Sequence, residues 1–150
     1  NFDGYVNVHL SADDLATVVA QGDIGINDLT GESQSYSLFE KDVDGVSGTF
    51  TLQRTESGAA LATVMLNGTM SGGVHPGHIH DDNAATGGGI AVSLTPVDGG
   101  SGMSQTHIEA KDDGSPITYD ELLEYDGYVN IHNSAEDLGT LIAQGDIGVN

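Results

Sequence analysis

Histidines are the side chains of this sequence whose type and spacing could do chemistry, because the 150 residues include six His and no Cys. His78 and His80 lie one residue apart in the segment His75-Pro-Gly-His-Ile-His80. Residues two apart on a β-strand point to the same face, so we expect both imidazoles to project together and Ile79 to turn into the core. Neutral imidazole is a ligand for copper and for zinc. The spacing therefore predicts two ligands of a metal site.

A third ligand is expected from His132, which ends the strand-like segment Tyr128-Val-Asn-Ile-His132. Three imidazoles would leave one coordination position open for water or a small ligand. The Pro-Gly pair that follows His75 holds it close to His78 and His80. We expect His75 to be a fourth ligand or to support one of the ligands. The alternative interpretation is that the His-x-His pair is hydrogen-bonded structure at a strand end, without a metal.

Acidic and amide side chains near these histidines could support the site. Asp81 and Asp82 follow His80 directly and could orient a ligand histidine or offer oxygen ligands to calcium. Asn130 is expected on the same strand face as His132. No acidic turn matches the EF-hand loop, and no nucleophile with its base or phosphate-binding glycine loop stands out. We therefore predict no catalytic residues and no enzyme.

The charge of the chain excludes several partners. Lys and Arg total 3 against 23 Asp and Glu, which gives a net charge of −20. Binding to nucleic acid requires clustered cations, whereas Lys41, Arg54 and Lys111 are scattered. The apolar runs are only a few residues long, far short of the roughly 20 that a membrane-spanning helix needs. We expect neither a nucleic-acid partner nor a membrane span.

The sequence ends as it begins. Residues 124–150 repeat residues 1–27 at an offset of 123 positions, with 18 identities in 27, and most differences are conservative. This pattern indicates a tandem array cut out of phase: residues 1–27 are the C-terminal strand segment of a preceding repeat, and residues 28–150 are one complete repeat. The alternative is a single domain in which an internal duplication packs two similar strands as a pseudo-symmetric pair.

In the array interpretation, residues 1–27 need a partner. Unpaired strands with an apolar face bury that face poorly alone and invite pairing with another chain. We expect this segment to complete a neighbouring molecule by strand addition, and head-to-tail contact of this kind builds filaments. His9 is the counterpart of His132, so it would act as a metal ligand only in a neighbouring domain or across a subunit junction.

The periodicity is mostly that of strands. Glycine-containing turn signals separate alternating or β-branched segments every 8 to 20 residues, which is typical of an antiparallel all-β sandwich or barrel. We predict an antiparallel, Greek-key-like β-sandwich with one short helix over 118–124, where Thr118 and Glu121 form a capping box. Ser11 and Ser134 are each followed three residues later by Asp, which suggests a helical turn after each histidine-ending strand. The predicted strands contain residues 5–9, 36–39, 48–52, 61–66, 90–94, 106–108 and 128–132.

These motifs together resemble the CHRD domain, a repeat first named in chordin and widespread in secreted bacterial proteins. The resemblance covers about residues 29–148 and rests on Gly77-His-Ile-His80, on the closing strand Tyr128-Val-Asn-Ile-His132 and on the ending Gln144-Gly-Asp-Ile147. The chain departs from the family pattern at residues 137–142, and the family's early Glu-Val-Pro-Pro segment is absent. The resemblance implies an all-β extracellular module. Its His-x-His is locally similar to the copper-binding strand of copper/zinc superoxide dismutase.

From these observations we expect a structural repeat unit of an extracellular or cell-surface array, built from copies of itself and binding copper or zinc. One alternative is an extracellular protein that sequesters copper or zinc. A superoxide dismutase-like metalloenzyme is disfavoured because a net charge of −20 repels superoxide. A further interpretation joins the first two, with metal shared by histidines of two repeats at a junction.

Overall fold

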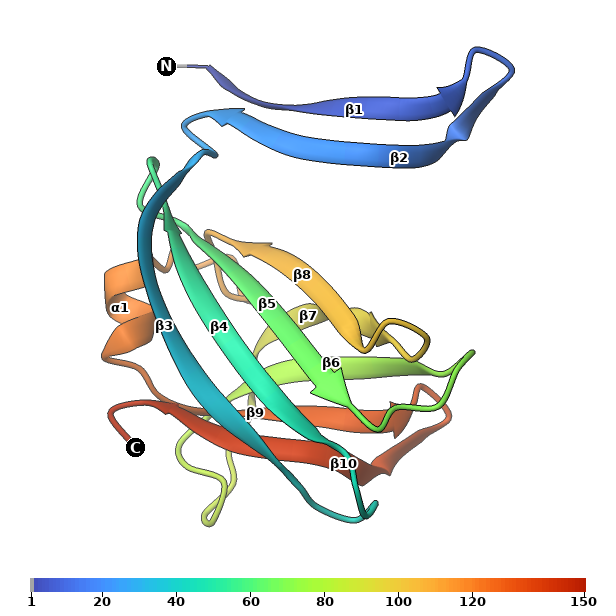
Figure 1. Ribbon diagram of the computed structural model, residues 1–150. Helices are drawn as coiled ribbons and strands as arrows, with labels where there is room; N and C mark the ends of the chain where they lie inside the picture. The colour runs from blue at the N-terminus through green and yellow to red at the C-terminus, as the bar shows by residue number, and fades with distance from the viewer. Residues whose placement is uncertain (1) are drawn as a thin grey trace.

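The computed structural model describes residues 2–150, and Asn1 of the predicted N-terminal segment lies outside the described residues. The described chain forms ten β-strands and one short α-helix (Figure 1). Every segment predicted as a strand falls within one of these strands. In chain order the elements are β1 (Asp3–Ser11), β2 (Asp14–Gly25), β3 (Leu29–Glu40), β4 (Ser47–Thr55), β5 (Ala60–Asn67), β6 (Val74–Asp81), β7 (Ile90–Asp98), β8 (Met103–Ile108), α1 (Tyr119–Leu123), β9 (Asp126–Ser134) and β10 (Asp137–Gly148).

Eight strands close into one antiparallel barrel in the order β10-β3-β4-β5-β8-β7-β6-β9. The predicted all-β antiparallel class is confirmed. The strands form one closed sheet, however, where we expected the two packed sheets of a sandwich. Closure pairs strands that would otherwise be edges, and it depends on pairings of β10 with β3 and of β7 with β8 that involve only a few residues.

Small aliphatic side chains fill the barrel, as expected from a sequence without Trp. Alternation along each strand sends one set of side chains inward, and Phe50 is the largest residue that is fully buried. The strands that carry the histidines follow the same rule, since Ile79 of β6 and both Val129 and Ile131 of β9 have no exposed surface. These inward residues fix which side chains β6 and β9 present on the outer face.

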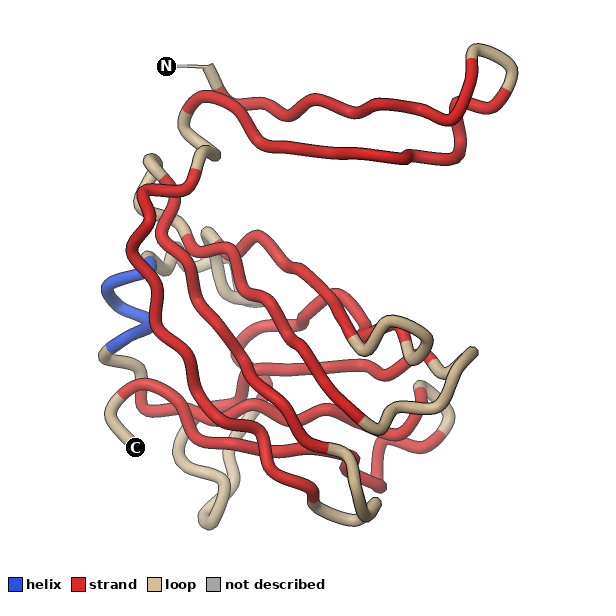
Figure 2. Tube along the Cα trace, viewed as in Figure 1, coloured by secondary structure: helices blue, strands red, loops and turns tan. Residues whose placement is uncertain are grey.

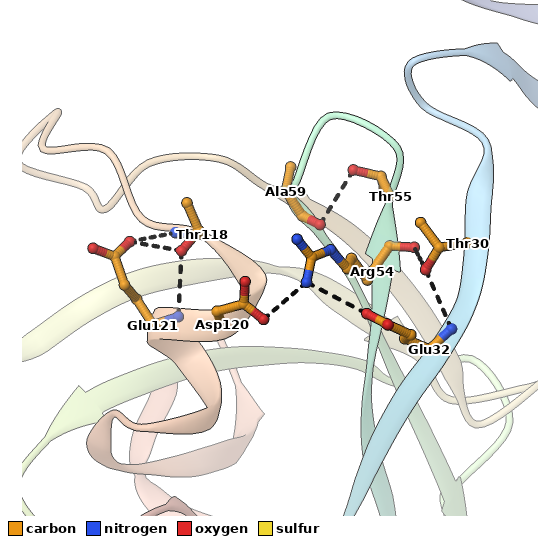
Figure 3. Close-up of polar contacts among 8 residues, drawn as sticks. All are labelled: Thr30, Glu32, Arg54, Thr55, Ala59, Thr118, Asp120 and Glu121. Carbon is orange, nitrogen blue, oxygen red and sulfur yellow. Dashed lines mark hydrogen bonds and ion pairs between the residues drawn. The ribbon is translucent and has the colours of Figure 1, made fainter.

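Helix α1 covers one end of the barrel beside β4, and its capping box is as predicted. The Thr118 hydroxyl accepts a hydrogen bond from the Glu121 amide, and the Glu121 carboxylate accepts one from the Thr118 amide (Figure 3). Arg54 of β4 lies between the carboxylates of Asp120, at 2.9 Å, and Glu32, at 3.4 Å. The helix is thereby joined to the β3–β4 wall. No helix in the described part of the chain has the length and apolar character needed to cross a membrane.

The prediction of a helical turn after each of the two histidine-ending strands is wrong. Both segments are tight hairpin turns, which join β1 to β2 and β9 to β10. The Ser11 hydroxyl accepts a hydrogen bond from the Asp14 amide at 3.1 Å, and the Ser134 hydroxyl accepts one from the Glu136 amide at 3.2 Å. Serine thus caps the backbone of a turn here, and the chain reverses to form a strand pair where a helix would have continued in one direction.

The hairpin β1–β2 stands apart from the barrel as a separate two-stranded sheet (Figure 2). A short link to β3 attaches it, and this link hydrogen-bonds to the turn between β4 and β5 through the carbonyls of Ile26 and Asp28. The second hairpin, β9–β10, lies within the barrel wall between β6 and β3. We call this place between β6 and β3 the closing position, because its hairpin completes the barrel.

Candidate metal centre

Two neighbouring strands of the barrel bring the predicted histidines together. Strand β6 pairs with β9 in antiparallel register, with His78 opposite Asn130 and His80 opposite Tyr128. His132 lies two residues beyond Asn130 on the same face of β9. The prediction that the His-x-His pair shares one face, with Ile79 in the core, is confirmed.

The three imidazoles form a compact group. One ring nitrogen from each of His78, His80 and His132 can be chosen so that all lie within 4.8 Å of one another. Nδ1 of His78 and Nε2 of His132 lie 3.0 Å apart and share a hydrogen bond. His132 is buried, and the other two rings are partly buried. This group could hold one metal ion, with each residue supplying one ligand atom.

Backbone carbonyls orient two of the rings. Nδ1 of His132 donates to the Leu138 carbonyl at 2.8 Å, and Nδ1 of His80 donates to the Gly88 carbonyl at 3.1 Å. A carbonyl can only accept, so the proton of each neutral ring is on Nδ1 and the lone pair is on Nε2. Nε2 of His80 is buried without a hydrogen-bond partner in the described structure. His80 thus has the usual arrangement of a metal-ligating histidine, a carbonyl-anchored imidazole with a free Nε2, whereas Nε2 of His132 accepts a hydrogen bond from Nδ1 of His78.

The electrostatics of the group favour the neutral, ligand form of the rings. Burial lowers the pKa of His78, and the neighbouring His132 and His80 lower it further. Burial is also the main cause that lowers the pKa of His132. A metal competes with protons for imidazole, so a depressed pKa leaves the site available at lower pH than ordinary histidines would allow.

Aromatic and amide groups surround the histidines. The Tyr128 ring stacks on the ring of His80, with centroids 4.9 Å apart, and its hydroxyl accepts a hydrogen bond from the Gly88 amide at 3.2 Å. Asn130, a predicted supporting residue, is buried on the face of the site and accepts a hydrogen bond from Gln144 at 2.8 Å. These contacts keep β9, β10 and the loop after β6 in place around the site.

Three supporting groups were missed from the sequence. The Gly88 carbonyl belongs to the loop between β6 and β7 and the Leu138 carbonyl to the start of β10, and the approach of a backbone carbonyl to a histidine leaves no signal in residue type. The Asp112 carboxylate accepts hydrogen bonds from the Ser93 amide at 2.9 Å and the Ser93 hydroxyl at 2.7 Å, on the β7 residue opposite His78. Its charge opposes the lowering of the pKa of His78. In the sequence, Asp112 belongs to the segment Asp112-Asp-Gly114, which indicates a turn and nothing about a histidine.

Two predicted ligands lie outside the three-histidine group. Nδ1 of His75 donates to the Asn133 carbonyl at 2.8 Å, and its Nε2 is buried without a partner in the described structure. It lines a separate hollow beside Met70 and Ile142. His9 lies on β1 in the detached hairpin, so it cannot reach the histidines of its own barrel in this arrangement.

The predicted acidic supports, Asp81 and Asp82, form no side-chain hydrogen bond with the histidine rings in the described structure. Asp81 accepts a hydrogen bond from the Tyr125 hydroxyl, and burial together with this bond raises the pKa of that phenol. Asp82 is exposed and adopts a left-handed backbone conformation, with φ of 63°. Within residues 2–150 these carboxylates belong to no group of three or more clustered potential ligands. Calcium binding at this turn therefore stays a prediction.

Fold and site together define an antiparallel β-barrel whose outer face carries three histidines able to bind a metal ion. Comparisons of the chain with protein-family models and with curated proteins find no match.

Proposed function

We propose that the protein is an assembly module, in which hairpin β1–β2 occupies the closing position in the barrel of an adjacent copy of the same repeat. The observation that supports this proposal is the contrast between the two hairpins, which share their sequence and pairing but differ in burial. The extracellular or cell-surface location of such an assembly is part of the proposal and rests on the resemblance to CHRD domains.

The two hairpins have the same strand register. Asp3 pairs with Gly25 in the first and Asp126 with Gly148 in the second, and every described pair from there to the turn corresponds at an offset of 123. Both hairpins have an irregularity next to the histidine, His9 or His132, and both end at a glycine with φ near 70°. The free hairpin therefore has the shape of a hairpin already seated in a barrel.

Burial separates the two hairpins. Positions that are buried in β9–β10, on either face of the barrel wall, are exposed to solvent at the equivalent positions of β1–β2. The exposed fractions of Tyr5, Val6, Val8 and Val19 are 61%, 50%, 52% and 54%, against 5%, 0%, 0% and 1% for their counterparts Tyr128, Val129, Ile131 and Ile142. Burying one such side chain is worth roughly 1.5–3 kcal/mol, so the free hairpin retains a large driving force for docking.

The closing position of an acceptor barrel is the surface that fits this hairpin. It already receives a hairpin of nearly the same sequence between β6 and β3. Each barrel has one such position, and its own β9–β10 competes with better packing, because Ile131 and Ile142 replace Val8 and Val19. An Ile-to-Val change costs about 0.5–1.5 kcal/mol in a core. Hairpin β1–β2 is therefore left available for a copy whose closing position is open.

Opening the closing position by mutation tests the proposal. Val129→Asp with Ile131→Asp, here called the open-barrel variant, puts two charges at fully buried positions of β9 and leaves β1–β2 intact. We expect this chain to form head-to-tail polymers, visible by light scattering and electron microscopy. Adding Val6→Asp and Val8→Asp should abolish them. A folded monomer, or polymers that survive these added changes, would overturn the proposal.

A disulfide test avoids buried charges altogether. Gln144 pairs with Phe39 between β10 and β3, so Gln21 of a donated hairpin should pair with Phe39 of the acceptor. The natural chain has no Cys, and Gln21→Cys with Phe39→Cys should give covalent multimers after refolding at high concentration and oxidation. Gln144→Cys with Phe39→Cys is the matched control and should give only intramolecular bridges. Bridged monomers in both chains would contradict donation.

A second candidate function, sequestration of copper or zinc, is favoured by the three-histidine group. The borderline-soft imidazole donors suit both ions. If sequestration is the purpose of the protein, His78→Ala should remove metal capacity and leave assembly unchanged. Metal analysis and light scattering on the same sample separate the two functions.

A further inference from the structure

We propose that the junction between two copies is itself a metal site, formed by His9 of the donated hairpin with His78 and His80 of the acceptor barrel. This inference rests on the proposed function, because it requires the hairpin to dock. Its ligand is a single imidazole-binding transition-metal ion of the copper or zinc class.

Register places His9 at this site. Nε2 of His132 lies 3.0 Å from Nδ1 of His78 because β9 pairs with β6 in the closing position. His9 occupies the same position of β1 as His132 does of β9, beside the same irregularity in strand pairing. A docked hairpin β1–β2 would therefore bring the His9 ring to the place that His132 takes in the chain's own barrel.

In the free hairpin, His9 lies away from the histidines with which it would share a metal ion, and its ring also lacks a hydrogen bond. Its Nδ1 is buried without a hydrogen-bond partner in the described structure, whereas Nδ1 of His132 donates to the Leu138 carbonyl. The counterpart of Leu138 is Leu15, and the same bond to the Leu15 carbonyl would orient His9 after docking. The docked hairpin would then present Nε2 of His9 in the same way that β9–β10 presents Nε2 of His132.

An open barrel lacks a complete site. Without a closing hairpin it retains only His78 and His80 of the three-histidine group, and docking adds the third ligand. A metal that binds the docked state and not the separate copies stabilises docking by mass action, so metal at 100 times its dissociation constant favours the docked state about 100-fold. Metal supply would therefore control how firmly successive copies are joined.

Charge gives the ion a second role at the junction. Each copy carries a net charge of −20, and residues 1–27 contain four Asp and no Lys or Arg. Docking therefore brings an acidic hairpin to an acidic barrel, on which Asp112 lies near His78. A divalent cation held between the two copies reduces this repulsion at the point of contact.

Exchanging the two related histidines tests the inference with Zn²⁺ alone as the probe. In the natural chain, His132→Asn should weaken zinc binding at least about 10-fold, and His9→Asn should leave it unchanged. In assemblies of the open-barrel variant, His9→Asn should weaken zinc binding and His132→Asn should leave it unchanged. The reason is that His132 lies on the displaced hairpin and His9 occupies the junction. Zinc affinity is measured by titration and junction strength by light scattering during addition of a chelator.

The outcomes separate this inference from the proposed function. Assemblies in which His9→Asn leaves both zinc affinity and chelator sensitivity unchanged would overturn the metal junction while hairpin donation stands. An open-barrel variant that folds and stays monomeric, or a Gln21→Cys, Phe39→Cys chain that gives only bridged monomers, would overturn the proposed function itself. If the open-barrel variant does not fold, the same His9→Asn comparison is made on the disulfide-linked multimers, which contain no added charges.

Discussion

Val8 and Ile131 hold the same position in two hairpins of identical register, yet Val8 is 52% exposed and Ile131 is fully buried. The difference arises from what each hairpin packs against, because β9–β10 lies between β6 and β3 and β1–β2 is not part of the barrel. The described structure thus contains two hairpins of closely similar sequence and one closing position. A substitution in one hairpin can therefore be compared with the same substitution at the equivalent position of the other.

Truncation at these two positions should affect stability very differently. Ile131→Ala removes a fully buried side chain and should lower the free energy of unfolding of the barrel by about 2–5 kcal/mol. Val8→Ala removes an exposed one and should change it by less than about 0.5 kcal/mol in the unassembled chain. Urea denaturation of the two variants measures both values. A large loss on Val8→Ala would show that β1–β2 packs on its own barrel in solution.

The three-histidine group predicts which substitutions weaken metal binding. His80→Ala removes a ring whose Nε2 is buried without a partner and should weaken zinc or copper binding at least about 10-fold. His107→Ala is the matched control, because His107 is exposed on β8 and lies outside the group. Isothermal titration gives both affinities. Equal affinity in the two variants would show that metal binds elsewhere.

Stability of the metal-free protein should fall as the pH is lowered. Burial lowers the pKa of His78 and of His132 below the ordinary value of about 6.5 that they regain on unfolding. Below this value the unfolded chain binds more protons than the folded chain, so the free energy of unfolding decreases as the pH falls, until the folded histidines also protonate. Urea denaturation in chelator should show this slope, and His78→Asn should reduce it. A variant with an unreduced slope would contradict the assignment.

The capping box of α1 offers a test of the predicted helix. Thr118→Ala removes the hydroxyl that accepts from the Glu121 amide and should destabilise the barrel by about 0.5–2 kcal/mol. Thr17→Ala is the control, since the Thr17 hydroxyl donates a hydrogen bond to Asp14 at the start of β2 in the free hairpin. Thermal unfolding should therefore show a lower midpoint only for the Thr118 variant. Equal midpoints would mean that the cap adds nothing to the fold.

Local patterns predicted much of this structure, and pairings between distant segments account for what they missed. Alternation located seven of the ten described strands, the His-x-His spacing implied β6, and the capping box located α1, whereas β2 and β10 were not predicted. Spacing alone joined His78 to His80, whereas joining them to His132 relied on the expectation of a neighbouring strand. Barrel closure could not be predicted, because it depends on short pairings between strands far apart in sequence. The same limit hid the Gly88 and Leu138 carbonyls, whose role depends only on where the backbone passes a histidine ring.

A mixed-disulfide experiment between two distinguishable chains tests the central claim most directly. One chain carries Gln21→Cys, and the other is the open-barrel variant with Phe39→Cys, labelled with a heavy isotope. Refolded together and oxidised, they should form a heterodimer whose bridge joins positions 21 and 39, and Val6→Asp with Val8→Asp in the first chain should abolish it. If the oxidised mixture contains no such heterodimer, hairpin β1–β2 does not close the barrel of another copy.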